Sequence, residues 1–270
     1  MSVNAPERGR PDRRPPLVLI ILGGVGLAVF VIPLAGLLAR TPWSALPRLL
    51  SGDVVTDALW LSLSTSLAAT VIAALIGVPL AWLMARVEFP GRYLVRGLVT
   101  LPLVLPPVVG GAALLFALGR RGLIGEPLSE ATGLVLPFST WGVVLANAFV
   151  AMPFLVITVE GALRNLDQRF EGAAATLGAG RWTVLRRVTL PMIAPSLVAG
   201  LVLTWARALG EFGATITFAG NLQGRTQTLP LAVFVALESD RDTAIALSLV
   251  MVAVSLGVLI LLRERWWKAL

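Results

Sequence analysis

Arg207 and Glu211 stand four residues apart within a long apolar stretch of the chain. In a helix, residues at this spacing share one face, so the two side chains can pair. Ionisable groups at membrane depth are costly and usually face a bundle interior or a wet cavity. Two interpretations stay open: an ion pair that holds this helix to its neighbours, or a group that acts directly in transport of a solute.

Hydroxyl and amide side chains follow this pair along the chain. Thr215 and Thr217 lie in a run of small residues, and a polar segment then brings Asn221, Thr226 and Thr228. Hydroxyls, amides and backbone N–H groups suit a hydrated anion that must pass without being held tightly. The alternative is a turn that is rich in Gly and Asn for ordinary loop reasons, and composition alone does not identify an anion.

The residue types that the chain lacks exclude several kinds of chemistry. There is no His and no Cys, and Lys268 is the only lysine. Thiol chemistry, disulfides, the usual zinc and haem ligands, and Ser-His or Cys-His catalytic pairs are therefore excluded. A P-loop needs Gly-Lys-Ser/Thr, so we expect no ATP binding through that motif, no cofactor, no metal and no catalytic residue. Any ATP would be hydrolysed by another subunit.

The composition predicts an all-α, polytopic membrane protein. The chain is 57% hydrophobic and 14% charged, with a mean hydropathy of +0.86, whereas a soluble domain is about one quarter charged. A bilayer core of ~30 Å needs about 20 apolar residues per helix. Because the apolar runs are long and continuous, they indicate helices rather than barrel strands. Six stretches qualify: 17–39, 59–85, 97–119, 138–159, 191–218 and 243–262.

The basic residues predict the orientation of these spans. Of the 22 Lys and Arg, 15 lie in the N-terminal tail, the loops 86–97 and 160–190, and the C-terminal tail, against 6 on the opposite side. By the positive-inside rule, both termini and the segment 160–190 are cytoplasmic. The net charge of +7 is then a consequence of topology, and the arginines are too dispersed to indicate nucleic acid as a partner.

The expected organisation follows from these spans. Residues 1–16 form a disordered cytoplasmic tail, and 17–57 hold the first helix and an external loop. The first apolar run is too long for a cleavable signal peptide. The core of five further spans covers 58–262, and 263–270 form a cytoplasmic tail.

The cytoplasmic segment 171–191 reads EGAAATLGAGRWTVLRRVTLP. Asp167 is a candidate N-cap, and Glu171 falls where negative charge complements the helix dipole. Gly178 and Gly180 are natural stops, which leaves a helix of about ten residues. An alanine-rich helix this short is marginal alone in water, so it must pack on its own membrane domain or on a partner. Its least bulky face carries Glu171, Ala174, Ala175 and Gly178.

Three prolines interrupt the stretch 97–119. Pro102, Pro106 and Pro107 are expected to break its hydrogen-bond ladder, and Gly110-Gly111 permit close packing beside the break. Discontinuous helices commonly line a transport path. The alternative is that Pro and Gly are simply frequent in membrane helices.

The segment Ala173-Ala174-Ala175-Thr176-Leu177-Gly178, followed nine residues later by Val188-Thr189-Leu190-Pro191, resembles the EAA loop of ABC-importer permeases. Gly172 stands where that family often has Glu, and Glu171 lies one position earlier. The resemblance implies a coupling helix that seats on a separate ATPase subunit. Arg181, Arg186 and Arg187 would contact acidic ATPase residues. Alternatively, they only set the orientation of the spans and contact lipid headgroups. The coupling residues so implied are Glu171, Ala173, Ala174, Gly178, Arg181, Leu190 and Pro191.

Residues 206–234 resemble the molybdate-importer permeases, through the run Gly210–Phe218 with Asn221 and the Thr-x-Thr-x-Pro loop that begins at Thr226. The resemblance extends to Leu101–Pro107 and Gly119–Gly125, and covers most of 58–262. It implies a type I ABC importer permease fold with six transmembrane helices in the cytoplasmic membrane of a prokaryote. It also implies a homodimer with two ATP-binding subunits and an external oxyanion-binding protein. The path or gate would comprise Pro106, Pro107, Arg207, Glu211, Thr215, Thr217, Asn221, Thr226 and Thr228.

Two kinds of alternative stay open. Within the family, tungstate or sulfate could be the substrate, because tetrahedral dianions differ little in charge and shape. A secondary transporter or channel would be expected to show inverted repeats and several membrane carboxylates. We find no repeat, and Glu211 is the one acid well inside a span. An intramembrane enzyme is disfavoured by the missing His and Cys.

Overall fold

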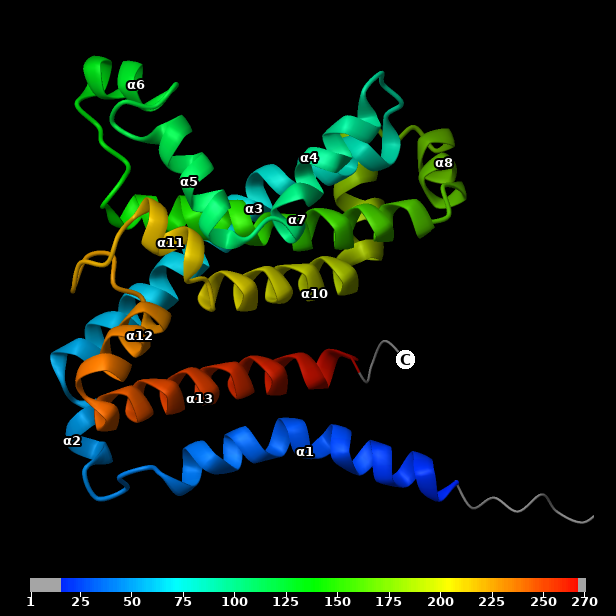
Figure 1. Ribbon diagram of the computed structural model, residues 1–270. Coiled ribbons are helices and arrows are strands. Elements are labelled where there is room, and N and C mark those ends of the chain that lie inside the picture. The colour runs from blue at the N-terminus through cyan, green and yellow to red at the C-terminus, as the bar shows by residue number, and fades with distance from the viewer. Residues whose placement is uncertain (1–15, 267–270) are drawn as a thin grey trace, which may run out of the picture. The chain divides into compact units, whose positions relative to one another are not determined.

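The computed structural model describes residues 16–266. The predicted tail 1–16, apart from Pro16, and residues 267–270 of the predicted C-terminal tail lie outside the described residues. Within them every regular element is a helix, as the composition predicts. The chain divides into two compact units, Met1–Pro42 and Trp43–Leu270. The first unit contains one long apolar helix, α1 (Leu17–Ala39), drawn in blue in Figure 1.

The second unit carries all the other helices. Its elements in chain order are α2 (Leu46–Leu50), α3 (Asp53–Arg86), α4 (Arg92–Val104), α5 (Pro107–Leu118), α6 (Gly125–Thr132), α7 (Thr140–Asn165), α8 (Arg169–Thr176), α9 (Arg181–Val184), the π-helical turn η1 (Leu185–Thr189), α10 (Leu190–Leu209), α11 (Gly213–Phe218), α12 (Leu229–Ser239) and α13 (Arg241–Trp266). Among the described residues, five helical runs are long and apolar enough to cross a membrane: Leu17–Ala39, Asp53–Arg86, Thr140–Asn165, Arg181–Leu209 and Arg241–Val258.

The stretch 97–119, which the sequence predicts as the third span, lies in two shorter helices, α4 and α5, and neither is among the five runs above. The helix ends at Val104, and Leu105 and Pro106 are extended, with ψ of 136° and 131°. A residue before proline is pushed out of the helical region, and neither Pro106 nor Pro107 has an N–H to donate. The predicted break is therefore confirmed at Pro106-Pro107. Pro102 instead lies inside α4.

The predicted bounds of the fifth span, 191–218, are wrong at both ends. The helical run begins at Arg181, passes through η1 and ends at Leu209, and α11 is a separate helix. Pro191 does not start the helix. It has no N–H, and its ring crowds the carbonyl four residues earlier. Pro191 is accommodated by a turn that is widened to π geometry, in which the Leu190 N–H donates to the Leu185 carbonyl.

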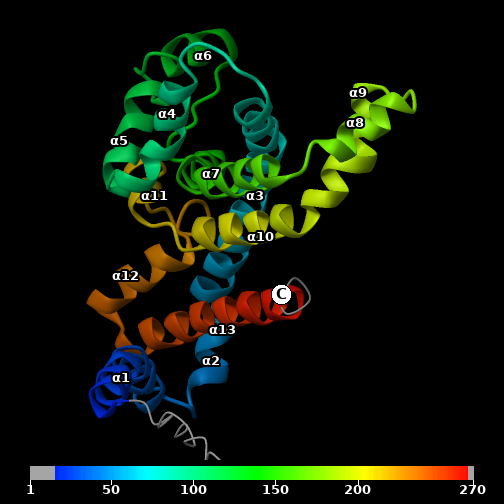
Figure 2. The ribbon, with the colours of Figure 1, turned by 90° about the vertical axis from the view of Figure 1, so that its right-hand side faces the viewer.

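The core of this unit lies where α3, α7 and α10 pack together. Its buried side chains are mostly small or branched, and Gly77 and Gly200 contact side chains of α7 directly. Small residues let membrane helices approach closely. Figures 1 and 2 both show α10 lying beside α7. The buried members of this cluster are Ala73, Ala81, Met84, Leu155, Val156, Val159, Leu163 and Ile193.

Helix α5 packs on α11 through glycine. A Cβ at Gly111 would lie 2.7 Å from the Ala214 carbonyl oxygen and 2.8 Å from the Thr217 Cβ. A Cβ at Gly213 would lie 3.0 Å from the Pro107 Cβ. The close packing predicted beside the proline break is confirmed, and it joins the break in the third span to the end of the fifth.

Replacing Gly111 with Ala is expected to destabilise the fold, because the new Cβ would collide with backbone that cannot move aside cheaply. The cost of such overpacking is about 1–3 kcal/mol. The unfolding midpoint of the purified chain in detergent measures it. Gly161→Ala is the matched control: Gly161 is also helical, but nothing lies within 4 Å of its added Cβ. Equal midpoints for the two variants would contradict the prediction.

Candidate functional site

Helix α8 ends at the predicted glycine, but its N-cap is Gln168 and not the predicted Asp167, which lies one residue earlier. The Asp167 carboxylate accepts a hydrogen bond of 2.9 Å from the Arg169 N–H, at the first residue of the helix. The helix ends at Thr176, and Gly178 takes a left-handed conformation with φ of +85°, which favours glycine. The helix has eight residues, slightly fewer than expected.

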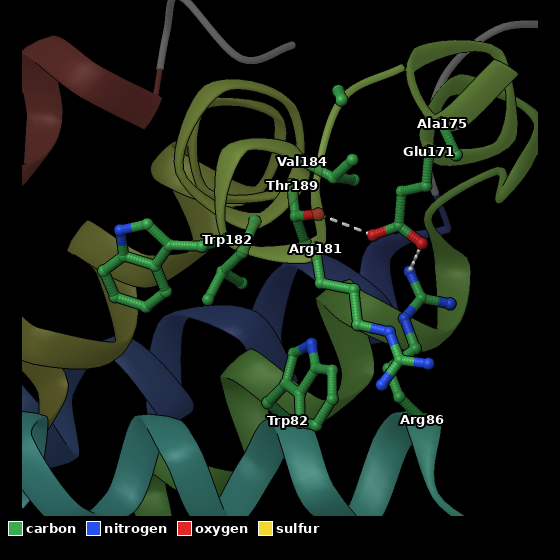
Figure 3. A pocket seen from close by; sticks show the side chains of 10 residues that line it. Trp82, Arg86, Glu171, Ala175, Arg181, Trp182, Val184 and Thr189 are labelled. Atoms are coloured by element: carbon green, nitrogen blue, oxygen red, sulfur yellow. Dashed lines mark hydrogen bonds and ion pairs between the residues drawn. The ribbon is translucent and has the colours of Figure 1, made fainter. Parts of the chain in front are cut away.

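The Glu171 carboxylate joins three elements. Its Oε2 lies 3.1 Å from Nη2 of Arg86, at the end of α3. Its Oε1 accepts a hydrogen bond of 2.6 Å from the Thr189 hydroxyl in η1, as Figure 3 shows. Thr189 is buried, and the Arg86 side chain is only 10% exposed. The carboxylate therefore fastens α8 to the ends of two long helices of its own chain.

The small-residue face of α8 lies toward its own chain, which is one of the two alternatives that the sequence leaves open. Glu171 and Ala175 turn toward the chain's own α3 and α9, where they line a cavity. The outward face carries Phe170 and Leu177, whose side chains are 54% and 89% exposed, with Ala173 between them. Their spacing of three and four residues places them in one row. One exposed row of α8 is thus apolar, ending at the C-cap Leu177, while Arg169 and Thr176 are exposed beside it. The sequence analysis did not identify Phe170 or Leu177.

The other predicted coupling residues lie along the same connection. Arg181 opens the helical run that leads into the membrane and lines the cavity beside Glu171. Leu190 packs against the α3–α7 core, and Pro191 follows the π-helical turn. Sequence reasoning missed Arg86 and Thr189. Arg86 could have been found as the basic residue that ends an apolar run, and Thr189 as a hydroxyl within the EAA-like segment.

Arg207 and Glu211 form the predicted ion pair. Arg207 Nη1 lies 2.6 Å from Glu211 Oε2. Glu211 is 2% exposed, and its Oε1 accepts a hydrogen bond of 2.9 Å from the Ala214 N–H in α11. The same carboxylate thus neutralises a charge at the end of α10 and receives a donor from α11. This geometry favours the interpretation in which the pair holds helices together.

Most of the predicted path hydroxyls are engaged within the chain. Thr215 is buried and donates to Oδ1 of Asn147 on α7 at 3.4 Å, while Thr217 donates to the Gly213 carbonyl at 2.8 Å. Thr226 is buried and accepts from the Leu222 N–H at 2.8 Å. Pro107, Glu211, Thr215 and Thr217 therefore gather around the α5–α11 contact. Asn221, Thr226 and Thr228 instead lie in the loop before α12 and at its start.

A second charged cluster was not expected from the sequence. Glu160 on α7 is buried and pairs with Arg96 of α4 and with Arg164 one turn further along α7, whose Nε donates at 3.1 Å. The spacing of Glu160 and Arg164 is the pattern that could have revealed it. This cluster fastens α4 to α7.

The fold and this site define a class: a polytopic α-helical membrane domain with helix breaks before α5 and after α10, and a short helix held outside the bundle. Residues 77–270 match the family of binding-protein-dependent transport system inner membrane components. The chain belongs to this family, and the resemblance to ABC-importer permeases is confirmed.

Individual relatives narrow the comparison. The molybdenum transport system permease protein ModB of Mycobacterium tuberculosis is 50% identical over 85% of this chain and 87% of that protein. The Escherichia coli protein of the same name is 42% identical over 79% and 95%. The Escherichia coli sulfate transport system permease protein CysT is 36% identical over 86% and 84%. A bacterial alginate ABC transporter, crystallised with its pentasaccharide-bound periplasmic protein, superimposes with a TM-score of 0.75 over 92% of both chains. Its identity of 19% shows the fold alone.

Arg207→Ala is expected to destabilise the chain more than Glu211→Gln. The first change leaves a carboxylate buried without its counter-charge, a loss of about 3–5 kcal/mol in comparable pairs. The second removes the charge but retains an acceptor for the Ala214 N–H. The double variant should recover most of the stability lost in Arg207→Ala. Unfolding midpoints of all four proteins form the test, and simple additivity of the two single changes would contradict it.

Proposed function

We propose that this chain is the permease subunit of an ATP-driven importer that translocates molybdate. The assignment of molybdate rests on the 50% identity to a molybdenum permease over most of both chains, compared with 36% identity to a sulfate permease. The chain itself is not an enzyme in this scheme, because ATP is hydrolysed by a separate subunit. Tungstate, a dianion of nearly the same shape, is the second candidate.

We propose that α8 is the surface on which the ATPase docks. Phe170 and Leu177 expose apolar area around Ala173, and exposed apolar patches of this kind mark interaction sites. Gly178, with φ of +85°, turns the chain immediately after this row. The Glu171 carboxylate would then carry displacement of α8 to α3 and η1, and so to the spans.

We propose a homodimer with two ATPase subunits and an external binding protein. The outward surfaces of α4 and α5 are apolar over both halves of the broken helix and would lie against lipid or a second copy. The path would run beside the break at Pro106 and Pro107 and the adjoining break after Leu209. There Arg207, Glu211, Thr215 and Thr217 position helix ends, while Asn221, Thr226 and Thr228 shape the outer loop. The exposed apolar side chains of α4 and α5 are Tyr93, Leu94, Leu98, Leu101, Leu103, Val104, Val108, Val109 and Phe116.

The location is the cytoplasmic membrane of a prokaryote, with the basic end of the bundle inside. Arginines gather where α3 ends, α4 begins and α7 ends, which is the end that bears α8. This distribution supports the positive-inside orientation. The arginines concerned are Arg86, Arg92, Arg96, Arg164 and Arg169.

The substrate is tested by titrating the cognate external binding protein with molybdate, tungstate and sulfate. We expect tight binding of molybdate and tungstate and much weaker binding of sulfate. Uptake of molybdate into proteoliposomes should then require the permease, the ATPase with ATP, and the binding protein together. Sulfate binding without molybdate binding would overturn the assignment of molybdate as the substrate. Uptake without the ATPase would favour a secondary transporter or channel.

Leu177→Asp is expected to abolish most ATPase binding without harming the fold. The substitution places a charge in the apolar face of α8, and the loss of a central interface residue typically weakens binding about tenfold or more. Co-purification of the ATPase with the full-length chain measures it. Leu123→Asp is the matched control, since Leu123 is 84% exposed near the end of the bundle that bears α6. Equal recovery of the ATPase with both variants would contradict the proposal that the ATPase docks on α8.

A further inference from the structure

A cavity of about 650 Å³ separates α8 from the end of α3. Its walls are α3, α8, α9 and η1, at the end of the long helices that carries the arginines. In the proposed orientation this end lies at the cytoplasmic surface of the membrane. Figure 3 shows the arrangement of its side chains. The residues that matter here are Trp82, Arg86, Glu171, Arg181, Trp182 and Thr189.

Arg86 is a buried cation with unused hydrogen-bonding capacity. Its Nε and Nη2 are inaccessible to solvent and, within the described residues, neither has a partner of hydrogen-bond geometry. Glu171 lies 3.1 Å from Nη2 but satisfies only the charge. Buried donors without acceptors are costly, and guanidinium presents a fork that matches the oxygens of a phosphate. Because Nε and Nη2 have no accessible surface, Nη1 is the nitrogen that is left to donate into the cavity, and it has no acceptor among the described residues. This donor indicates an anionic ligand.

The charge of the cavity indicates which kind of anion fits. Arg86 and Arg181 contribute two positive charges, and Glu171 removes one. Figure 3 shows the Arg181 side chain reaching into the cavity from α9. A net charge of +1 balances a phosphodiester, which carries a single negative charge. A free dianion such as phosphate or molybdate would leave excess negative charge beside the Glu171 carboxylate.

The surroundings fit a lipid. Trp82 and Trp182 lie at the cavity, and indole rings concentrate at the headgroup level of a bilayer. Basic pockets between helices on the cytoplasmic side bind anionic headgroups. From Trp82 toward the start of α3, Leu75 and Ile76 are exposed and would lie along the acyl chains.

We propose that this cavity binds the headgroup phosphate of an anionic phospholipid. The phosphodiester would accept hydrogen bonds from Arg86 and Arg181, and the two tryptophans would flank the glycerol. A lipid in this position braces α8 against the end of α3, so the link between the docking helix and the membrane depends on lipid composition. Lipid binding itself requires neither the ATPase nor a transported anion, so its test is independent of the proposed function.

The test is native mass spectrometry of the full-length chain with phosphatidylglycerol, with phosphatidylcholine as the zwitterionic comparison. Arg181→Gln should lower the affinity for phosphatidylglycerol about tenfold, as expected for the loss of a charge-assisted hydrogen bond. Arg186→Gln is the matched control, because Arg186 is exposed on the same segment and carries the same charge but does not line the cavity. It should bind phosphatidylglycerol like the unmodified chain.

Three results would overturn the proposal. Equal loss in Arg181→Gln and Arg186→Gln would reduce the effect to general attraction between a basic surface and anionic lipid. Equal binding of phosphatidylcholine would remove the role of net charge. Displacement of phosphatidylglycerol by an equal concentration of inorganic phosphate or molybdate would assign the cavity to a free oxyanion instead of a lipid.

Discussion

The position of α8 depends on the contacts of the Glu171 carboxylate with Arg86 and Thr189. Through Arg86 and Thr189 the carboxylate fastens a short outer helix to α3 and to the start of the run Arg181–Leu209. An eight-residue helix has little stability of its own in water, so α8 keeps its position because these partners hold it. Its apolar outer face is then available to a partner, while its inner face lines the cavity with Arg86 and Arg181.

The membrane domain combines a tightly packed part with two interruptions. α3, α7 and α10 meet through small side chains and form the tightly packed part. The break before α5 and the break after α10 lie together, because Gly111 and Gly213 bring α5 and α11 into close contact. Glu211 satisfies the backbone at one of these breaks and neutralises Arg207. A displacement of α8 would thus enter at the basic end of the long helices and reach the breaks through the packed core.

Much of this arrangement follows from local sequence, and the rest does not. Helical class, the break at Pro106-Pro107, the stop at Gly178 and the pairing of Arg207 with Glu211 each depend on neighbours in sequence, and each was predicted. The start of the fifth span at Arg181 was missed, because a proline such as Pro191 is common at the start of a helix. The helix continues past Pro191 only because a π-helical turn precedes it, and the sequence did not indicate that turn. The partners of Glu171 were missed for another reason. Arg86 is far away in the sequence, and only the packing of α3 brings it to the carboxylate. The apolar row of Phe170 and Leu177 was overlooked because the alanine face appeared the more available one.

In the proposed function, Glu171 transmits motion from the docked ATPase to the spans. The direct measurement is the number of ATP molecules hydrolysed per anion imported, in proteoliposomes that contain the full complex with Glu171 or with Glu171→Gln. We expect the variant still to bind and stimulate the ATPase but to import little, so the ratio rises several-fold. An unchanged ratio would contradict it, whether import and hydrolysis both persist or both fall in proportion.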